Sequence, residues 1–350
     1  MDPVAIARAL VDIDSTTGRE AEAGRWLAAF LRDQGFTVAE QPVDDTRFNV
    51  FAIAPGPNGS GRDRPPSVVF STHFDCVPPF FPSRIDGDRL YGRGSCDAKG
   101  ILAAQICAAD TLRREGETRV GLLFLVGEER GSDGARAANL LNPANPENLE
   151  NPANPANHFL IDGEPTDNRL GVATRGMLRL KLRAKGRAAH SSYPELGESA
   201  IDKLIEALIE LRQIALPSDP ILGRTHYSIG LISGGVAPNV ISPSAEAEVM
   251  FRIVSDAPTV RRALEPLEAR VTIEHVLEVP PVRLMTVPGF DAAVFPFTTD
   301  IPYLSRWGQP LLFGPGSVHA AHTAEEFVSI ADLHAAVGHY VTLARELLSR

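Results

Sequence analysis

The sequence predicts an α/β protein in which an α+β sandwich domain is inserted into a domain with a mixed, largely parallel sheet. Helical and strand-like segments alternate in the first half of the 350 residues, and long alternating strands replace them after Asp162. A chain of this length also exceeds one ordinary compact core. We expect residues 1–172 and 284–350 to form the first domain, and residues 173–283 the inserted one.

Apolar spacing defines the elements of the first domain. Residues 19–34 carry a helical apolar stripe, and Gly35 can cap its carboxyl end. The near-continuous apolar run at 120–126 is typical of a strand that is buried on both faces. The remaining elements expected in this domain are strands at 48–54 and 67–72 and a helix at 98–114.

After residue 162 the pattern becomes one of long strands separated by helices, which is typical of an α+β sandwich. The expected strands are 172–184, 227–232 and 245–254, and the expected helices are 199–214 and 259–269. Between the two patterns, residues 142–157 repeat Asn-Pro units. Because proline interrupts both helices and sheet ladders, we expect a loop or a disordered insertion there.

The composition excludes several classes of protein. The formal net charge is −10, whereas nucleic acids and anionic membranes require a basic surface. No stretch approaches the roughly 20 apolar residues that span a bilayer, and the amphipathic start of the chain lacks the pattern of a signal peptide. Three cysteines cannot all pair and are expected to be reduced thiols. We therefore expect a cytoplasmic protein that binds neither nucleic acid nor membranes.

Five short clusters of metal-ligating residue types each lie at the end of a predicted strand, where open α/β sheets place their ligand sites. Each cluster alone could be a simple turn, but their occurrence together in one chain indicates a metal site. The clusters occupy residues 71–75, 91–100, 127–131, 161–166 and 314–326.

Individual members of these clusters have structural alternatives. His73, two residues before Asp75, could bind a metal while that carboxylate holds its other ring N–H, or both could be exposed at a strand end. Asp97 could simply cap the helix that follows it. Glu128 and Glu129 could belong to a solvated acidic turn, although adjacent carboxylates point in different directions and can serve different purposes.

Together these motifs resemble the dinuclear zinc family that contains acetylornithine deacetylase, succinyl-diaminopimelate desuccinylase, aminoacylases and carboxypeptidase G. The resemblance covers essentially the whole chain except the Asn-Pro-rich insertion. It implies a zinc-peptidase-like catalytic domain, an inserted lid and dimerisation domain, and a homodimer. It also implies two Zn²⁺ ions, for which Co²⁺ or Mn²⁺ could substitute because the same ligand types suit them.

The resemblance assigns the metal ligands by their positions in the motifs. Asp97 would bridge the two ions, because divalent cations about 3.5–4 Å apart need a shared anion to relieve their repulsion. Asp162 competes with Glu164 as the ligand in the fourth cluster. His319 competes with His322 in the fifth, where an alanine before the histidine and an acidic pair after it favour His322. The five assigned ligands are His73, Asp97, Glu129, Glu164 and His322.

The resemblance also implies catalytic roles. Asp75 would orient His73, and Glu128 would be the general base that takes a proton from a metal-bound water and returns it to the leaving amine. His190 would stabilise the oxyanion at the active site of a partner subunit, although a histidine at a strand end can also be purely structural. The family glycine before this histidine is Ala189 here.

Three further features suit substrate recognition. Arg252 could pair with a substrate α-carboxylate, or it could form a surface salt bridge. Asn239 could donate a hydrogen bond to the same group. The stretch 296–300 could line the acyl or side-chain pocket, as a comparable Thr-Asp segment does in the family.

The expected activity is metal-dependent hydrolysis of the amide bond of a small N-acyl-L-amino acid, as in acetylornithine deacetylase. The alternatives with the same chemistry are desuccinylation of a diaminopimelate-like substrate and the cleavage of peptides by a dipeptidase or carboxypeptidase. A noncatalytic binding protein is disfavoured, because a protein that only binds has no use for the base Glu128.

Overall fold

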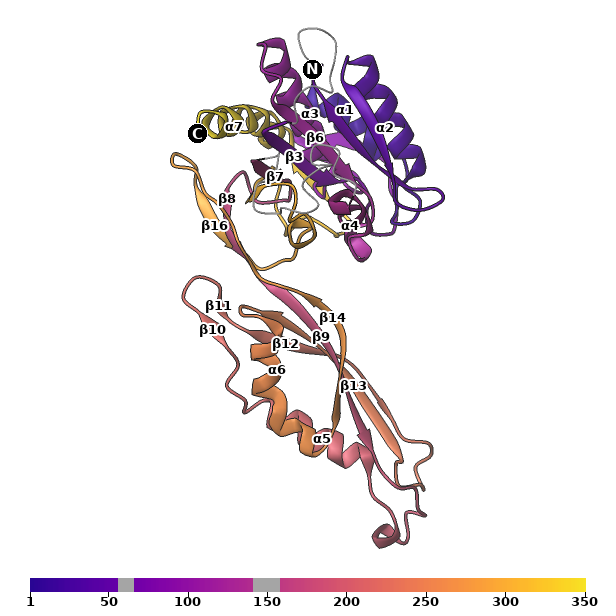
Figure 1. Cartoon of the computed structure of the whole chain (residues 1–350). Coiled ribbons are helices and arrows are strands. Elements are labelled where there is room, and N and C mark those ends of the chain that lie inside the picture. The colour runs from indigo at the N-terminus through magenta and orange to yellow at the C-terminus, as the bar shows by residue number, and fades with distance from the viewer. Residues whose placement is uncertain (56–65, 141–157) are drawn as a thin grey trace. The chain divides into compact units, whose positions relative to one another are not determined.

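The computed structural model describes residues 1–55, 66–140 and 158–350 (Figure 1). The Asn-Pro-rich segment 142–157, expected to be a loop or disordered, lies outside the described residues. The chain divides into two compact units. The first unit comprises Met1–Val172, Leu284–Ala293 and Thr299–Arg350, and the second comprises Ala173–Arg283 and Val294–Thr298.

The first unit is built on a six-stranded sheet of order β1-β2-β6-β3-β7-β17. Strands β6, β3, β7 and β17 run parallel to one another, while β2 is antiparallel to β6 and β1 is antiparallel to β2. The sheet is therefore mixed and largely parallel, which confirms the predicted fold class. The strands are β1 (Thr37–Pro42), β2 (Phe48–Ile53), β3 (Val68–His73), β6 (Val120–Leu125), β7 (Phe159–Asp162) and β17 (Gln309–Leu312).

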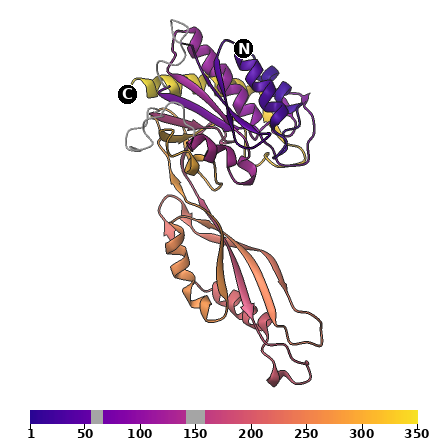
Figure 2. The same cartoon turned by 45° about the vertical axis from the view of Figure 1, so that its right-hand side comes forward.

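Successive side chains of these strands alternate between two apolar layers, as the pleat of a strand requires. Phe70 and Phe124 belong to the larger core cluster on one face, whereas Val69 and Leu123 pack with Trp307 on the other. Figure 2 shows the strands lying between helices. Helix α4 (Asp133–Leu140) contributes to the smaller cluster. The helices of the larger cluster are α1 (Pro3–Val11), α2 (Ala21–Asp33), α3 (Lys99–Arg114) and α7 (Ile330–Leu348).

A small antiparallel sheet of order β18-β5-β4 connects distant parts of this unit. Its strands are β4 (Arg84–Asp86), β5 (Arg89–Tyr91) and β18 (Phe327–Ser329). The register places Phe327 opposite Tyr91. This pairing joins the chain just after the fifth cluster to the chain just before Asp97, a connection that the sequence patterns did not reveal.

The second unit is built on a four-stranded antiparallel sheet of order β12-β13-β9-β14. Apolar side chains of β9 and β13 pack against helices α5 (Ala200–Leu211) and α6 (Ala257–Leu264), which lie on one face of the sheet in Figure 1. The expected strand 172–184 is divided at Arg175 between β8 and β9. The strands are β9 (Gly176–Lys185), β12 (His226–Gly234), β13 (Ser244–Ile253) and β14 (Thr272–Val279).

Shorter elements complete the described chain. A three-stranded sheet of order β15-β8-β16 consists of β8 (Leu170–Thr174), β15 (Val282–Arg283) and β16 (Ala292–Phe295). Strands β10 (Ser218–Asp219) and β11 (Gly223–Arg224) pair with each other. Among the residues that the structure describes, no helix is both long enough and apolar enough to cross a bilayer.

Candidate metal centre

His73 is the last residue of β3, and its imidazole lies between two carboxylate-bearing residues. Its Nδ1 is 3.0 Å from the backbone carbonyl oxygen of Asp75, and its Nε2 is 3.0 Å from Oδ1 of Asp97. A neutral imidazole donates from only one nitrogen, so a bond from Nδ1–H to Asp75 leaves the Nε2 lone pair facing a carboxylate oxygen. That contact requires either a second proton or a cation between the two atoms. The pair therefore suits a metal.

Asp97 contacts a second imidazole through its other oxygen, because its Oδ2 is 3.3 Å from Nε2 of His322. The alternative of a helix cap does not apply, since Ala98 is the N-cap of α3 and no side chain caps this helix. Burial raises the pKa of Asp97, but the hydrogen bonds and charges of His322 and His73 outweigh it and hold that pKa well below its ordinary value. A carboxylate with one imidazole on each oxygen has the arrangement of a bridging ligand.

Glu129 completes a convergent set of donors with these residues. Its Oε1 is 2.9 Å from Nε2 of His322, and the ligand atoms of His73, Asp97 and Glu129 all lie within 4.8 Å of one another. His322 has a φ of 63°, a left-handed conformation that is uncommon for residues other than glycine. Mixed histidine and carboxylate donors are the ligand types that zinc accepts. The donor set therefore fits a divalent metal.

The surrounding carboxylates raise the pKa values of both imidazoles. Hydrogen bonds to Asp97 and Glu129 raise the pKa of His322 to about 10. Burial opposes the charged form of His73, but its hydrogen bonds to Asp75 and Asp97 still raise its pKa well above the ordinary value. Without a metal, each imidazole is thus held as a cation by the carboxylates around it. A divalent ion would replace those protons, so metal binding should release them.

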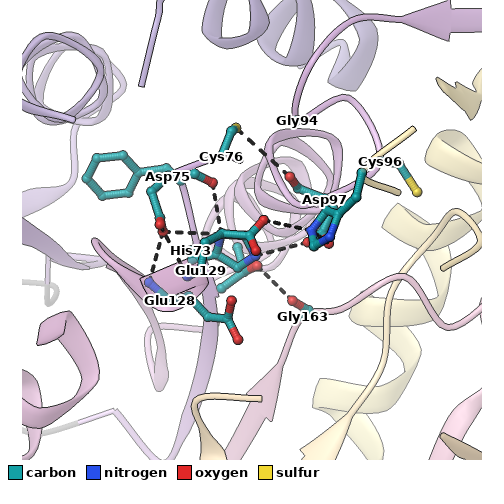
Figure 3. Close-up of polar contacts among 12 residues, drawn as sticks. His73, Asp75, Cys76, Gly94, Cys96, Asp97, Glu128, Glu129 and Gly163 are labelled. Carbon is teal, nitrogen blue, oxygen red and sulfur yellow. Dashed lines mark hydrogen bonds and ion pairs between the residues drawn. The ribbon is translucent and has the colours of Figure 1, made fainter. Parts of the chain in front are cut away.

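Asp75 ties the end of β3 to the turn after β6 (Figure 3). Its carboxylate, which is inaccessible to solvent, accepts hydrogen bonds from the backbone N–H groups of Glu128 at 3.0 Å and Glu129 at 3.3 Å. The hydroxyl of Thr17 donates a third bond at 2.8 Å. Its Oδ1 is also 3.4 Å from Nδ1 of His73. The sequence suggested only this last contact, yet Asp75 positions both sides of the centre.

Glu128 lies beside the ligand set but is separate from its contacts. In Figure 3 the Glu129 carboxylate takes part in the dashed contacts, whereas the Glu128 carboxylate lies apart from them. Desolvation raises the pKa of Glu128 well above its ordinary value, and the negative charges of Asp300 and Glu129 raise it further. These surroundings favour the protonated form of the carboxyl group more than water does, as suits a residue that accepts and returns a proton.

The fourth cluster contributes two buried carboxyl groups. Asp162, the last residue of β7, is 2% exposed, and Glu164 is 6% exposed. Burial raises the pKa of Glu164 well above its ordinary value, and the charges of Asp97 and Glu128 add to this effect. Burial and the charge of Asp300 do the same to Asp162. The convergent set of donor atoms within 4.8 Å includes neither residue among those described.

Asp300 is a buried acid whose neighbours the sequence did not indicate. It is 2% exposed, and burial raises its pKa to about 7. The sequence suggested only that the stretch 296–300 lines a pocket. The structure places Asp300 close enough to Asp162 and Glu128 for their charges to interact.

His319, the alternative to His322, does not join the set, and neither do two nearby thiols. His319 is exposed, and no contact within the described part of the chain joins it to His73, Asp97 or Glu129, whereas His322 contacts both Asp97 and Glu129. The thiols of Cys76 and Cys96 are buried, and burial raises the pKa of Cys76 to about 11 and that of Cys96 well above its ordinary value. In the metal-free protein these groups are therefore protonated thiols, and the convergent set of donors within the described residues contains neither.

His190 and Asn239 lie next to each other in the second unit, and both are exposed. Nδ1 of His190 accepts the backbone N–H of Ser192 at 3.1 Å, and the backbone carbonyl of Asn239 accepts the N–H of Ser191 at 3.0 Å. A β-bridge also pairs His190 with Val240. The local fold thus holds the backbone of residues 190–191 beside that of residues 239–240.

Arg252 lies on β13 of the same unit, where its side chain is half-buried. Burial lowers its pKa. None of the hydrogen bonds and ion pairs within the described part of the chain involves its guanidinium, so the surface salt bridge considered as an alternative is not formed there. A half-buried guanidinium of this kind is suited to pair with an anionic ligand.

Comparison with known proteins gives consistent matches over nearly the whole chain. The model of "Peptidase family M20/M25/M40" matches residues 69–346. A peptidase M20 domain-containing protein of Schizosaccharomyces pombe is 38% identical over 348 residues, covering 96% of this chain and 82% of that protein. A probable carboxypeptidase of Aspergillus terreus is 39% identical over 375 residues, covering 95% and 83%.

Solved structures share the fold at much lower identity. A tripeptidase from Staphylococcus aureus has a TM-score of 0.78 and 18% identity, and the match covers 99% of this chain and 98% of that one. The M20 metallo-carboxypeptidase Sso-CP2 from Sulfolobus solfataricus has a TM-score of 0.74 and 16% identity, and the match covers both chains completely.

Proposed function

Because the chain belongs to peptidase family M20/M25/M40, we propose that it is a metal-dependent carboxypeptidase or dipeptidase, which hydrolyses the last amide bond of a short peptide. The observation that carries this proposal is Asp97 with an imidazole on each carboxylate oxygen, beside the separate carboxyl group of Glu128. Relatives named probable carboxypeptidase, 36–39% identical to this chain, support peptides as the substrate.

An N-acyl amino acid, the substrate implied by the resemblance to acetylornithine deacetylase, is the second candidate. Such a molecule differs from a dipeptide only in what is attached to the acyl carbon, because both end in an amino acid with a free carboxylate. Deacetylation or desuccinylation would therefore use the same residues. The half-buried, unpaired Arg252 favours both candidates over substrates that lack this carboxylate.

The ligand set would hold two divalent ions, with zinc favoured by its histidine and carboxylate donors. We assign His73 and Glu164 to one ion, Glu129 and His322 to the other, and Asp97 to both. When bound, the ions would acidify a water and polarise the scissile carbonyl. The first unit is then the catalytic domain.

Glu128 would move the proton that hydrolysis requires. Its carboxylate would take a proton from the attacking water as the new C–O bond forms, and give it to the amine nitrogen as the C–N bond breaks. Asp75 supports this role, because it holds the backbone N–H of Glu128 at 3.0 Å. The loop that carries the base is thereby fixed to the strand that carries His73.

The second unit would provide substrate contacts. Arg252 would bind the substrate carboxylate, with Asn239 as a further donor, and His190 would donate a hydrogen bond to the oxyanion in a partner subunit. The contact between His190 and the backbone N–H of Ser192 supports a donor role, because Nδ1 accepts there and the proton must then lie on Nε2. This unit is then a lid and dimerisation domain.

Hydrolysis of dipeptides and of their matching carboxamides tests the proposed activity. Purified protein with Zn²⁺ or Co²⁺ should cleave dipeptides that end in a free carboxylate, and each matching carboxamide should be cleaved at least about tenfold more slowly, because a charged hydrogen bond contributes about 1.5–3 kcal/mol. N-acetylornithine, N-acetylcitrulline and N-succinyl-diaminopimelate test the second candidate. Arg252→Met should remove the preference for the carboxylate. If the metal-loaded protein hydrolyses none of these compounds, the proposed function is wrong.

We also propose a homodimer formed through the second unit. Three isoleucines spaced by four residues lie on the outer face of α5, and strand β12 at the edge of the sheet exposes further apolar side chains. Water-exposed apolar groups in such an arrangement are typical of an interface. The exposed residues are Ile201, Ile205, Ile209, Leu231 and Ile232.

Ile205→Glu should convert this dimer into monomers, because it puts a charge into the centre of the apolar face. Sedimentation velocity measures the change directly. Leu140→Glu, which introduces the same charge at an aliphatic side chain 69% exposed in the first unit, is the control and should remain dimeric. A monomeric wild-type protein, or an unchanged sedimentation coefficient in Ile205→Glu, would contradict this interface.

Finally, we propose a cytoplasmic location. Cys76, Cys96 and Cys107 are all buried, and none forms a disulfide. Free buried thiols are typical of proteins from reducing compartments.

A further inference from the structure

Glu326 joins the segment that carries His322 to the loop that carries Asp97. It follows His322 by four residues, and its side chain is fully buried. Its Oε1 accepts hydrogen bonds from three backbone N–H groups, those of Gly94 at 3.0 Å, Cys96 at 3.2 Å and Asp97 at 3.1 Å. Three donors that converge on one oxygen fix the path of the chain up to and including Asp97.

The second oxygen of Glu326 has its own partner. Nη1 of Arg93 donates to Oε2 at 2.6 Å, and this arginine is only 3% exposed. Nε of Arg93 donates to the backbone carbonyl of Pro79 at 3.2 Å, so the guanidinium is itself held in place. Each buried charge depends on the other, because either one left alone in this environment would be costly.

The backbone around Glu326 extends the same connection. Its carbonyl accepts the N–H of Gly92 at 3.1 Å, and strands β18 and β5 pair immediately beyond. The preceding residue, Glu325, behaves differently. Its side chain is 75% exposed and pairs with Arg84, which is itself 51% exposed. Of the acidic pair after His322, only the second member is therefore bound to the loop of Asp97.

We propose that Glu326 is a positioning residue that sets the separation between Asp97 and His322, and thereby the affinity for the ion that these two ligands share. The inference rests on the proposed function. Metal ligands must lie within about 0.2 Å of their preferred distances, yet these two come from segments 225 residues apart. The ion assigned to Glu129 and His322 is bound by both Asp97 and His322. The other ion is bound by Asp97 but not by His322.

Glu326→Gln tests this inference while keeping the size of the side chain. The amide NH₂ of Gln must point either at Arg93 or at the three backbone N–H groups. Since all of these are donors, the NH₂ group faces a donor in both orientations. We expect the ion assigned to Glu129 and His322 to bind about 10–100-fold more weakly, the usual effect of losing a hydrogen-bond partner of a metal ligand. The other ion shares only Asp97 with this pair of ligands and should be weakened less. Calorimetric titration of the metal-free protein with Co²⁺, together with metal analysis, measures both affinities.

Two further variants complete the experiment. Glu325→Gln is the matched control and should bind both ions as the wild type does. Glu326→Asp keeps the charge but is one methylene too short to reach the loop and Arg93 together, so it should also weaken binding of the ion assigned to Glu129 and His322. A purely structural role would lower the melting temperature of the metal-free protein without separating the two affinities.

The outcomes distinguish the two proposals. If the wild type binds two ions and Glu326→Gln binds both with unchanged affinity, the role of Glu326 is wrong although the function stands. If Glu326→Gln does not fold, wild-type affinities in Glu326→Asp overturn the role equally. A wild-type protein that binds no Co²⁺ would instead overturn the proposed function.

Discussion

Replacing Glu128 with Gln is expected to lower kcat by about 10²–10⁴-fold, the usual contribution of a general acid and base, while the content of bound metal stays unchanged. The amide has the same shape but cannot take a proton from water at neutral pH. The carboxylate of Glu128 lies apart from the contacts among Asp97, Glu129 and His322, so the ligands should remain in place. Steady-state kinetics and metal analysis of the same preparation test both parts.

The control for this substitution lies one residue along the chain. Glu129→Gln makes the same chemical change at the residue whose Oε1 is 2.9 Å from His322, and it should lose an ion as well as activity. A Glu128→Gln protein with the wild-type kcat would exclude Glu128 as the base. A Glu128→Gln protein that had lost its metal would show that this residue is a ligand.

Asp97→Asn should abolish binding of both ions and reduce activity below detection. The neutral amide cannot offset the repulsion between two divalent cations, and it removes the anion that contacts both His73 and His322. Metal analysis after purification in the presence of Zn²⁺ measures the loss. Asp86→Asn, at a side chain 76% exposed, is the control and should keep both ions. Retention of two ions in Asp97→Asn would contradict the bridging assignment.

The same variant tests the electrostatics of the metal-free centre. The pKa of His322 is raised to about 10, chiefly by its hydrogen bonds to Asp97 and Glu129. Because the pKa of His322 is raised in the folded state, its contacts with Asp97 and Glu129 stabilise the metal-free protein against unfolding. This contribution is complete below the ordinary histidine pKa of about 6.5. That stability is lost as the pH rises through about 10. In Asp97→Asn the pKa of His322, followed by NMR, should fall toward the ordinary value.

The elements that the local patterns predicted lie within a few residues of observed ones, because apolar periodicity reports directly on the face that a helix or strand buries. The helix expected at 98–114 is observed at Lys99–Arg114, and the strand expected at 120–126 at Val120–Leu125. Several elements were not predicted, among them α7 and β14 and the strands β5 and β18 of three residues each. Three residues are too few to show a period, and such strands form only because a partner from a distant segment is available.

Local sequence therefore accounts for the fold class, the order of the ligand-rich clusters and the chemistry of their side chains. These depend on residue type and on neighbours a few positions away. It left open whether Asp97 caps a helix and whether His319 or His322 meets the other donors. Tertiary structure decided both, because Asp97 Oδ2 and His322 Nε2 approach to 3.3 Å only where parallel strands end together and β18 pairs with β5. It also gave Glu326 its three backbone donors, which no spacing within the sequence could specify.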